Sequence, residues 1–344
     1  MAEHVALYRK YRPTSFKDVI GQDSVVGVLK KAIADKNVAH AYLFAGGRGT
    51  GKTTIARILA KEIGTSEKDL YEMDAASNRK IDDFRELNDS VHTLPFDSEF
   101  KVYIIDEVHM LTKEAFNAFL KTLEEPPQHV VFVLATTEID KLPDTIVSRC
   151  QTYTFQKPTR VILASAVLKV AKGEKATLDK DAAELIAILA EGSFRDALGI
   201  LQKVLSYSSD KKISRSEVES VTGAPRAELV NGVLTAISEN NLEVALGHIG
   251  GAAETNVDFV TFQKLLLDRV RAVMLLRNTG AMKDTLKEQF SKEDFELLEK
   301  LAKDEESKAN SKVLSALLGA YADTPHAYIK QLPLELALVE TLQA

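Results

Sequence analysis

The sequence predicts an α/β domain built on a doubly wound parallel sheet, followed by two all-helical domains. Over residues 1–157, short apolar runs alternate with helix-like segments, and a glycine-rich stretch joins one such run to a helix. After residue 159 no convincing strand follows, and apolar residues recur at helical spacing, as at Phe259, Phe262 and Leu266. The length of 344 residues fits two or three domains.

The candidate strands are short apolar runs of the kind that a parallel sheet buries on both faces. They are Ala41–Ala45, Leu70–Met73, Lys101–Ile105 and Val130–Ala135. The intervening segments predict helices at 24–36, 52–63, 81–91 and 113–125, with a short helical turn at Leu142–Val147. The proline- and glycine-containing segments Lys157-Pro158 and Thr222–Pro225 indicate breaks between domains. We therefore predict domains at 1–157, 158–221 and 222–344.

Composition limits the class of protein. The net charge of −6 excludes a generally basic nucleic-acid binder, so any DNA contact must come from a local patch or from assembled subunits. The single cysteine, Cys150, excludes an intramolecular disulfide and a cysteine-based metal site. The chain opens without an apolar signal core and its apolar runs are too short to span a bilayer, so we expect a cytoplasmic protein with no membrane partner.

A phosphate-binding loop is the clearest motif, because the segment fits G-x-x-x-x-G-K-[ST] between an apolar run and a helix-like stretch. Its residues are Gly46, Gly47, Arg48, Gly49, Thr50, Gly51, Lys52 and Thr53, and Thr54 follows directly. Glycines allow backbone N–H groups to surround a phosphate chain, and the helix N-terminus favours negative charge. We expect Lys52 to reach the β- and γ-phosphates and the Thr53 hydroxyl to bind Mg²⁺.

Two carboxylates follow the apolar run Val102–Ile105. Because ligands lie at the carboxyl ends of strands in such sheets, Asp106 could hold Mg²⁺ and Glu107 could polarise an attacking water. Thr136 and Thr137 end the next buried run, where a polar side chain would face the γ-phosphate or that water. Threonine also simply suits a strand end.

Two arginines are ambiguous from the residues alone. Arg149 follows the turn Leu142–Val147, where a lone arginine is usually exposed, yet an arginine from a neighbouring subunit can stabilise a transferring phosphoryl group. Arg195 follows a Gly-Ser helix-start signal, and pairing with Asp196 or Glu191 is the simpler interpretation.

These motifs stand in one order with several others along the chain. The others are Tyr8–Thr14 with Phe16, Val19–Gln22, Asp74–Asn78, Asp106–Leu111, Leu123–Pro127, Ala135–Thr137, Ser148–Cys150, Gly192–Leu198 and Gln331–Ala337. Together they closely resemble the gamma/tau subunits of the bacterial DNA polymerase III clamp loader, which are AAA+ ATPases. The resemblance covers nearly the whole chain; it is strong to about residue 200 and weaker between 225 and 325.

The resemblance implies an AAA+ nucleotide-binding domain, a helical lid and a helical oligomerisation collar. The residues expected at the adenine end of the nucleotide are Tyr8, Arg12, Val19 and Ile20. Lys52 and Thr53 are expected to hold the phosphates and Mg²⁺. Asp106 and Glu107 are expected to form the Walker B pair, and Thr137 is expected to act as the first sensor. Arg149 would be an arginine finger acting in trans on a neighbour's ATP, and Arg195 a second sensor touching its own subunit's nucleotide.

The resemblance also implies a function, partners and cofactors. The chain would use ATP and Mg²⁺ to open a sliding clamp and load it onto primed DNA, as a motor subunit of a hetero-pentamer. Arg79, Lys80 and Arg85 are candidates for DNA-phosphate contacts, and a solvated basic turn is the alternative. Nothing in the sequence indicates a nucleotidyl-transfer site, so we do not expect the chain to polymerise DNA itself.

The sequence departs from the family in two ways. Family members usually carry a four-cysteine zinc module after the P-loop helix, whereas residues 64–70 contain no cysteine, so zinc is not expected. The sequence also ends at the collar, so the short gamma form, rather than the tail-bearing tau form, is the expected comparison.

Three other functions stay open. Asp106–His109 matches a DExH helicase box, and a branch-migration or helicase motor is one alternative, although the helical second half argues against a second α/β motor core. A non-hydrolysing scaffold subunit is another, against which the intact Lys52 and Glu107 argue. A eukaryotic or archaeal loader small subunit is the third, and the segments Asp74–Asn78 and Leu123–Pro127 favour the bacterial group.

Overall fold

The structure is a computed structural model of the 344-residue chain and describes residues 5–77, 87–255 and 257–342. The chain divides into two compact units. The first contains residues 1–163 and 190–199, and the second contains residues 164–189 and 200–344. The predicted domain limits at 157 and 221 stay predictions.

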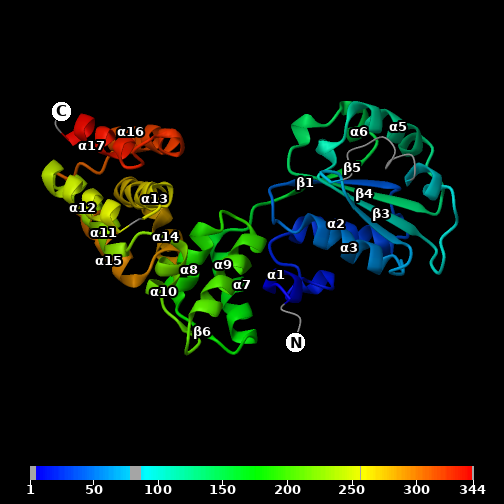
Figure 1. Ribbon diagram of the computed structural model, residues 1–344, viewed down its shortest axis with the longest axis horizontal. Coiled ribbons are helices and arrows are strands. Elements are labelled where there is room, and N and C mark those ends of the chain that lie inside the picture. The colour runs from blue at the N-terminus through cyan, green and yellow to red at the C-terminus, as the bar shows by residue number, and fades with distance from the viewer. Residues whose placement is uncertain (1–4, 78–86, 256, 343–344) are drawn as a thin grey trace. The chain divides into compact units, whose positions relative to one another are not determined.

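A five-stranded parallel sheet forms the centre of the first unit, with strand order β2-β3-β4-β1-β5 (Figure 1). The strands are β1 (Ala41–Gly46), β2 (Leu70–Asp74), β3 (Lys101–Asp106), β4 (Val130–Thr136) and β5 (Gln151–Phe155). The first four confirm the predicted runs as strands, but β2 is a largely exposed edge strand and not a strand buried on both faces as predicted, and the sequence prediction missed β5. As an edge strand that pairs only with β1 and is largely exposed, β5 has no continuous apolar run.

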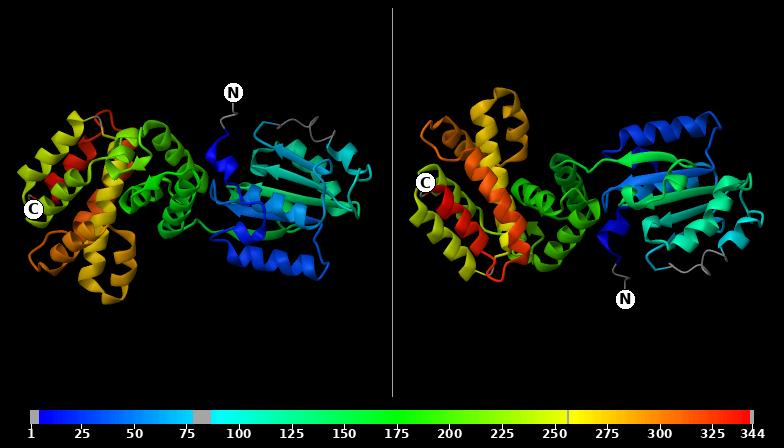
Figure 2. Two further views of the ribbon diagram at one scale, coloured as in Figure 1. Left: turned by 90° about the horizontal axis from the view of Figure 1, so that it is seen from below. Right: turned by 90° about the horizontal axis from the view of Figure 1, so that it is seen from above.

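Helices cover both faces of this sheet (Figure 2). On one face, α2 (Asp23–Ala34) and α3 (Lys52–Glu62) pack against alternate strand residues such as Tyr42 and Phe44. On the other face, α5 (Lys113–Glu124) buries Phe119 against Leu43 and Phe132. Successive strand residues point to opposite faces, so one buried run supplies both cores.

Short elements complete the first unit. They are α1 (Leu7–Lys10), α6 (Asp144–Val147) and the 3₁₀ helices η1 (Phe16–Asp18), η2 (Val108–Met110) and η3 (Ile139–Lys141). Residues 87–91 are helical, and the rest of the helix predicted at 81–91 lies outside the described residues.

The second unit is almost entirely helical, as predicted. Its helices are α8 (Lys180–Leu189), α10 (Arg215–Thr222), α11 (Ala227–Ser238), α12 (Leu242–Glu254), α13 (Phe259–Asn278), α14 (Lys283–Gln289), α15 (Lys292–Lys303), α16 (Ser311–Asp323) and α17 (Leu332–Leu342), with η4 (Gly280–Met282) and η5 (Thr324–His326). Two helices, α7 (Arg160–Gly173) and α9 (Phe194–Tyr207), have residues in both units. Helix α13 packs against α11, α15 and α16, so it forms the core of the C-terminal helices.

The expectation of no strand after residue 159 was wrong in one detail. Thr177–Leu178 (β6) and Lys212–Ile213 (β7) form a parallel pair. Each strand has two residues, which is too short to show a periodicity in the sequence. Among the described residues, no helix is long and apolar enough to cross a membrane.

A buried aspartate stabilises the short connector between α3 and β2. Asp69 is fully buried, and its carboxylate accepts hydrogen bonds from the backbone N–H groups of Phe96 and Asp97 and from the Ser66 hydroxyl. Burial opposes the charged form, but these donors outweigh it and lower the pKa of Asp69 to about 2.

We therefore expect Asp69→Asn to lower the free energy of unfolding of the first unit at pH 7 by about 2–3 kcal/mol, because charged hydrogen bonds are lost. The folded-state pKa lies below the unfolded value of about 3.9, so this stabilisation is present above pH 4 and is lost towards pH 2. Urea unfolding at several pH values measures both effects. Asp97→Asn is the control, since that side chain is 44% exposed beside Lys68; an equal loss in the control would contradict the prediction.

Candidate nucleotide-binding site

The loop between β1 and α3 requires its glycines. Gly46, Gly49 and Gly51 have positive φ angles of 153°, 70° and 104°, which side chains rarely adopt. A Cβ on Gly46 would lie 2.6 Å from the Phe155 carbonyl oxygen, and one on Gly49 would lie 2.0 Å from Ser193 Oγ. The motif thus forms a tight loop that leads directly into a helix N-terminus, the geometry that suits an anion.

Lys52 lies inside this loop. Its side chain is buried, and Nζ donates hydrogen bonds to the carbonyl oxygens of Gly46 at 2.7 Å and Gly47 at 2.9 Å. Burial lowers the pKa of Lys52, whereas the carboxylates of Glu107 and Asp106 act in the opposite direction. A cation is therefore held where backbone N–H groups and a helix N-terminus favour phosphate.

Two oxygen atoms that could bind a metal ion lie next to each other, one close to the lysine in the sequence and the other at the end of β3. Thr53 Oγ1, in the first turn of α3, donates to Asp106 Oδ2 at 2.8 Å, from the carboxyl end of β3. A hydroxyl and a carboxylate oxygen are ligands that Mg²⁺ prefers. The donor set therefore fits Mg²⁺ held between the P-loop helix and the sheet.

Glu107 is held by the next strand. Its backbone has φ 49°, in the left-handed region that non-glycine residues rarely adopt. Thr137 contacts its carboxylate twice, since the N–H donates to Oε2 at 3.3 Å and Oγ1 donates at 2.9 Å. Strands β3 and β4 are neighbours in the sheet, so their carboxyl ends bring these two side chains together.

Residues from three separate segments meet around the loop. Arg12 Nε donates to Thr54 Oγ1 at 3.2 Å, and the Arg195 guanidinium lies 5.7 Å from the centre of the Tyr8 ring. The N–H of Phe194 donates to the Gly49 carbonyl oxygen at 3.0 Å. The start of α9 is therefore attached to the P-loop itself.

The remaining residues predicted for the site lie in the core, at the surface or outside the described residues. Val19 packs against the core beneath α2 and α3, while Ile20 is 41% exposed and Arg48 is exposed. The DNA-contact candidates Arg79, Lys80 and Arg85 lie outside the described residues.

Arg149 is held at the surface by its own chain. Its guanidinium makes an ion pair with Glu124 at the end of α5 and donates to the Thr145 carbonyl oxygen at 2.8 Å. The side chain is 34% exposed, so a neighbouring molecule could reach it.

Burial raises the pKa of the adjacent Cys150 thiol to about 12.

Sequence patterns assigned no role to Gln22, which the structure places under the loop. Its side-chain amide is buried; Nε2 donates to the carbonyl oxygens of Gln156 at 2.7 Å and Thr50 at 3.4 Å. Oε1 accepts from the Gln156 N–H at 3.2 Å. Gln22 thus connects the P-loop to the chain after β5, a role that no local sequence pattern predicts.

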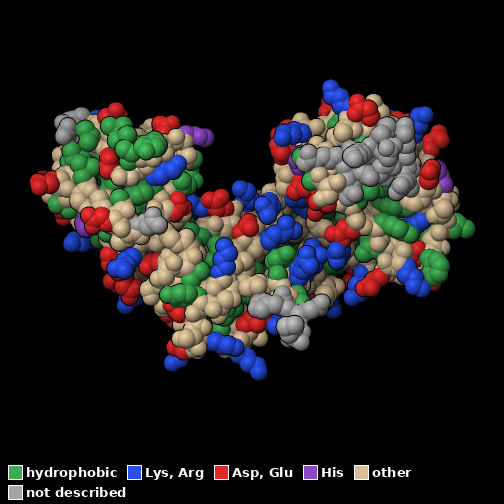
Figure 3. Space-filling view, viewed as in Figure 1, with side chains coloured by type: hydrophobic (Ala, Val, Ile, Leu, Met, Phe, Trp, Pro, Cys, Tyr) green, Lys and Arg blue, Asp and Glu red, His purple; other side chains and the backbone are tan. Residues whose placement is uncertain are grey.

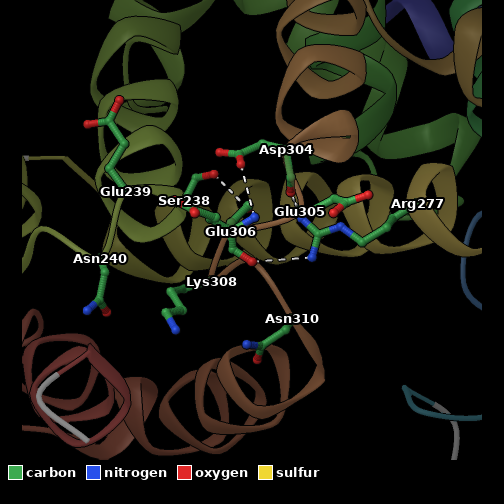
Figure 4. A pocket seen from close by; sticks show the side chains of 10 residues that line it. Ser238, Glu239, Asn240, Arg277, Asp304, Glu305, Glu306, Lys308 and Asn310 are labelled. Atoms are coloured by element: carbon green, nitrogen blue, oxygen red, sulfur yellow. Dashed lines mark hydrogen bonds between the residues drawn. The ribbon is translucent and has the colours of Figure 1, made fainter.

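A separate pocket lies in the second unit (Figure 4). Arg277 points into it and donates to backbone carbonyl oxygens, including those of Leu301 and Ser307. The other lining residues include Glu239, Asp304, Glu305 and Glu306. These four carboxylates outnumber the two cations of the lining, Arg277 and Lys308, and would repel phosphate, so we place the candidate nucleotide site at the P-loop.

The parallel sheet, its loop and the carboxylates define a P-loop protein of the AAA+ fold. A solved structure shares that fold: the RuvB Holliday junction branch migration motor of Thermotoga maritima. The TM-score is 0.54 at 24% identity, over 72% of this chain and 86% of that one.

Sequence comparison identifies the family within that class. Residues 65–159 match the family model described as DNA polymerase III, delta subunit. DNA polymerase III subunit gamma/tau of Mycoplasma pneumoniae is 39% identical over 76% of this chain and 41% of its own length. DNA polymerase III subunit tau of Bacillus subtilis is 36% identical over 82% of this chain and 54% of its own length. Subunit gamma of Buchnera aphidicola is 34% identical over 80% of each chain. The chain belongs to the gamma/tau family of DNA polymerase III subunits, and it spans about half the length of the first two relatives.

Proposed function

We propose that this chain is the ATP-hydrolysing motor subunit of the sliding-clamp loader of a cytoplasmic DNA polymerase III holoenzyme. It would use ATP to open the clamp and load it onto primed DNA. One observation carries the proposal: the P-loop lysine, the Thr53–Asp106 pair and the Thr137–Glu107 pair are all intact and lie at the carboxyl ends of β1, β3 and β4. A scaffold subunit would not need this set.

The residues divide the chemistry among them. The loop N–H groups and Lys52 would bind the phosphates, and Thr53 and Asp106 would hold Mg²⁺, which would neutralise phosphate charge. Glu107, oriented by Thr137, polarises the attacking water. Tyr8, Arg12 and Arg195 border the remainder of the nucleotide, with Val19 and Ile20 at the adenine end. Arg149 completes the site of a neighbouring subunit.

The C-terminal helices would form the oligomerisation collar, after a lid at 158–221. Large apolar side chains are exposed on α16, on α17 and between them: Leu318, Tyr328, Ile329, Leu332 and Leu336. In Figure 3, hydrophobic side chains reach the surface over the region that Figure 1 labels α16 and α17. An apolar patch of this kind is typical of a subunit interface. The partners would be the other subunits of a hetero-pentamer, the clamp and primed DNA.

We expect Leu336→Asp to weaken assembly with the partner subunits by about tenfold or more, because an apolar interface contact becomes a buried charge. Size-exclusion chromatography and sedimentation of the reconstituted complex measure this. Tyr207→Asp is the control, since this 64% exposed residue lies on α9, outside the proposed patch. Assembly of Leu336→Asp as tight as the wild type would contradict the collar interface.

An ATPase assay of the reconstituted complex tests the proposed function. We expect ATP turnover that rises when clamp and primed DNA are added together. No turnover would favour a scaffold subunit. Turnover without any response to the clamp, accompanied by strand displacement, would favour a branch-migration or helicase motor.

A further inference from the structure

Three side chains and one backbone group form a closed cycle of polar contacts beside Glu107: two hydrogen bonds and one ion-pair contact. His109 Nδ1 lies 2.9 Å from Thr136 Oγ1, and Thr136 Oγ1 accepts the N–H of Glu138 at 3.0 Å. His109 Nε2 lies 3.3 Å from Glu138 Oε1. In one consistent arrangement the Thr136 hydroxyl donates to Nδ1, the Glu138 N–H donates to Thr136 Oγ1, and Nε2–H faces the Glu138 carboxylate.

The cycle encloses the residue that holds the catalytic carboxylate. Thr136 and Glu138 are the chain neighbours of Thr137, whose N–H and hydroxyl both donate to Glu107 Oε2. The imidazole itself lies 3.5 Å from the same oxygen. Any shift of the Thr136–Glu138 backbone would therefore displace both donors to Glu107 at once.

Burial stabilises the His109 and Thr136 side of this arrangement, while the Glu138 side chain is 45% exposed. The His109 side chain is 5% exposed and Thr136 is fully buried, so a broken bond would leave a polar group without water. Lys141 holds Glu138 from the other side at 2.7 Å, which, together with His109, lowers the pKa of Glu138. The carboxylate is thus kept charged as an acceptor for Nε2–H.

We propose that His109 is a positioning residue for ATP hydrolysis: it fixes the end of β4 through both ring nitrogens and so holds Thr137 against Glu107. The inference rests on the proposed role of Glu107. In this role His109 touches neither phosphate nor water; it acts through its contacts with Thr136 and Glu138 and through its own contact with Glu107 Oε2.

The first test separates turnover from binding. In the reconstituted loader, His109→Ala is expected to lower kcat about tenfold to hundredfold, as displacements of up to about 1 Å do. The Kd for a fluorescent ATP analogue stays within about twofold, because Lys52 and Thr53 are untouched. A kcat within about twofold of the wild type would overturn the proposal.

Two conservative variants test the hydrogen bonds themselves. An asparagine amide reaches the position of Nδ1 and retains the bond to Thr136, whereas a glutamine amide reaches that of Nε2 and retains the bond to Glu138. His109→Asn and His109→Gln should therefore each retain more of kcat than His109→Ala. If both fall to the level of the alanine variant, positioning through these bonds is wrong.

His129→Ala is the matched control. His129 Nε2 also contacts two backbone carbonyl oxygens, of Val91 at 3.2 Å and Thr93 at 3.1 Å, and Glu107 is not among its contacts. Its loss should lower the melting temperature without changing kcat. A fall in kcat as large as that of His109→Ala would show that general destabilisation explains both.

A spectroscopic measurement is independent of turnover. ¹⁵N NMR of histidine-labelled protein at pH 8, assigned with the His109→Asn variant, should show a proton on Nε2 and none on Nδ1. A proton on Nδ1 would overturn the cycle. If the wild-type loader does not hydrolyse ATP, the proposed function fails, and the NMR result still decides whether the cycle exists.

Discussion

Replacing Arg149 with alanine is expected to lower the clamp- and DNA-stimulated ATPase rate by about 10³–10⁵-fold, the range for an arginine that stabilises a transferring phosphoryl group. The side chain is partly exposed and is held by Glu124 and Thr145 of its own chain. An exposed ion pair of this kind contributes only about 0–1 kcal/mol, so a phosphate can compete for the guanidinium. Binding of ATP should be unchanged, since Lys52 and Thr53 remain.

Mixed assembly tests whether Arg149 acts in trans. Loaders are assembled from equal amounts of Lys52→Ala and Arg149→Ala chains, and the stimulated rate is compared with that of each variant alone. If Arg149 serves a neighbour, some sites combine an intact Lys52 with an intact Arg149, and activity partly returns. No recovery would indicate that both residues serve the same subunit's site. A normal rate for Arg149→Ala alone would exclude the arginine finger altogether.

Lys52→Ala is expected to weaken ATP binding by about 10²–10³-fold, because removal of one partner of a buried charge pair costs about 2–5 kcal/mol. Nζ is buried within the loop, where its positive charge faces the phosphate position. Titration with a fluorescent ATP analogue measures the loss.

The control is Lys61→Ala, which removes an exposed lysine from the same helix. Thermal unfolding shows whether the Lys52→Ala loop still folds, since Nζ also bonds two loop carbonyl oxygens. Wild-type affinity in a folded Lys52→Ala protein would mean that the phosphates bind elsewhere.

Local sequence predicted most of the sheet for a simple reason. Strands buried on both faces are mostly apolar, so Ala41–Gly46, Lys101–Asp106 and Val130–Thr136 are visible in the sequence as apolar runs. Strand β5 is mostly exposed at the sheet edge and reads as Gln-Thr-Tyr-Thr-Phe, with no run to detect. The paired two-residue strands at Thr177 and Lys212 depend entirely on tertiary contact.

The candidate site follows the same division. Lys52, Thr53, Asp106 and Glu107 stand in motifs whose spacing along the chain reflects their chemistry, so the sequence alone identifies them. The partners of these residues are not local: the structure pairs Thr137 with Glu107 across 30 positions. The role that the resemblance implies for Arg149 is tested by the Arg149→Ala variant and the mixed assembly.

The sequence by itself determined the class of fold, the phosphate loop and the family, because glycines, buried runs and adjacent carboxylates leave a pattern over a few residues. Tertiary structure alone decided that Gln22 supports the loop, that Glu124 holds Arg149, and that His109 joins both sides of Thr137. These contacts connect residues brought together by parallel strand order, in which neighbouring strands are far apart in the chain. A hydrogen bond between such residues depends on where the strands end in space, and the local periodicity of the sequence does not predict those positions.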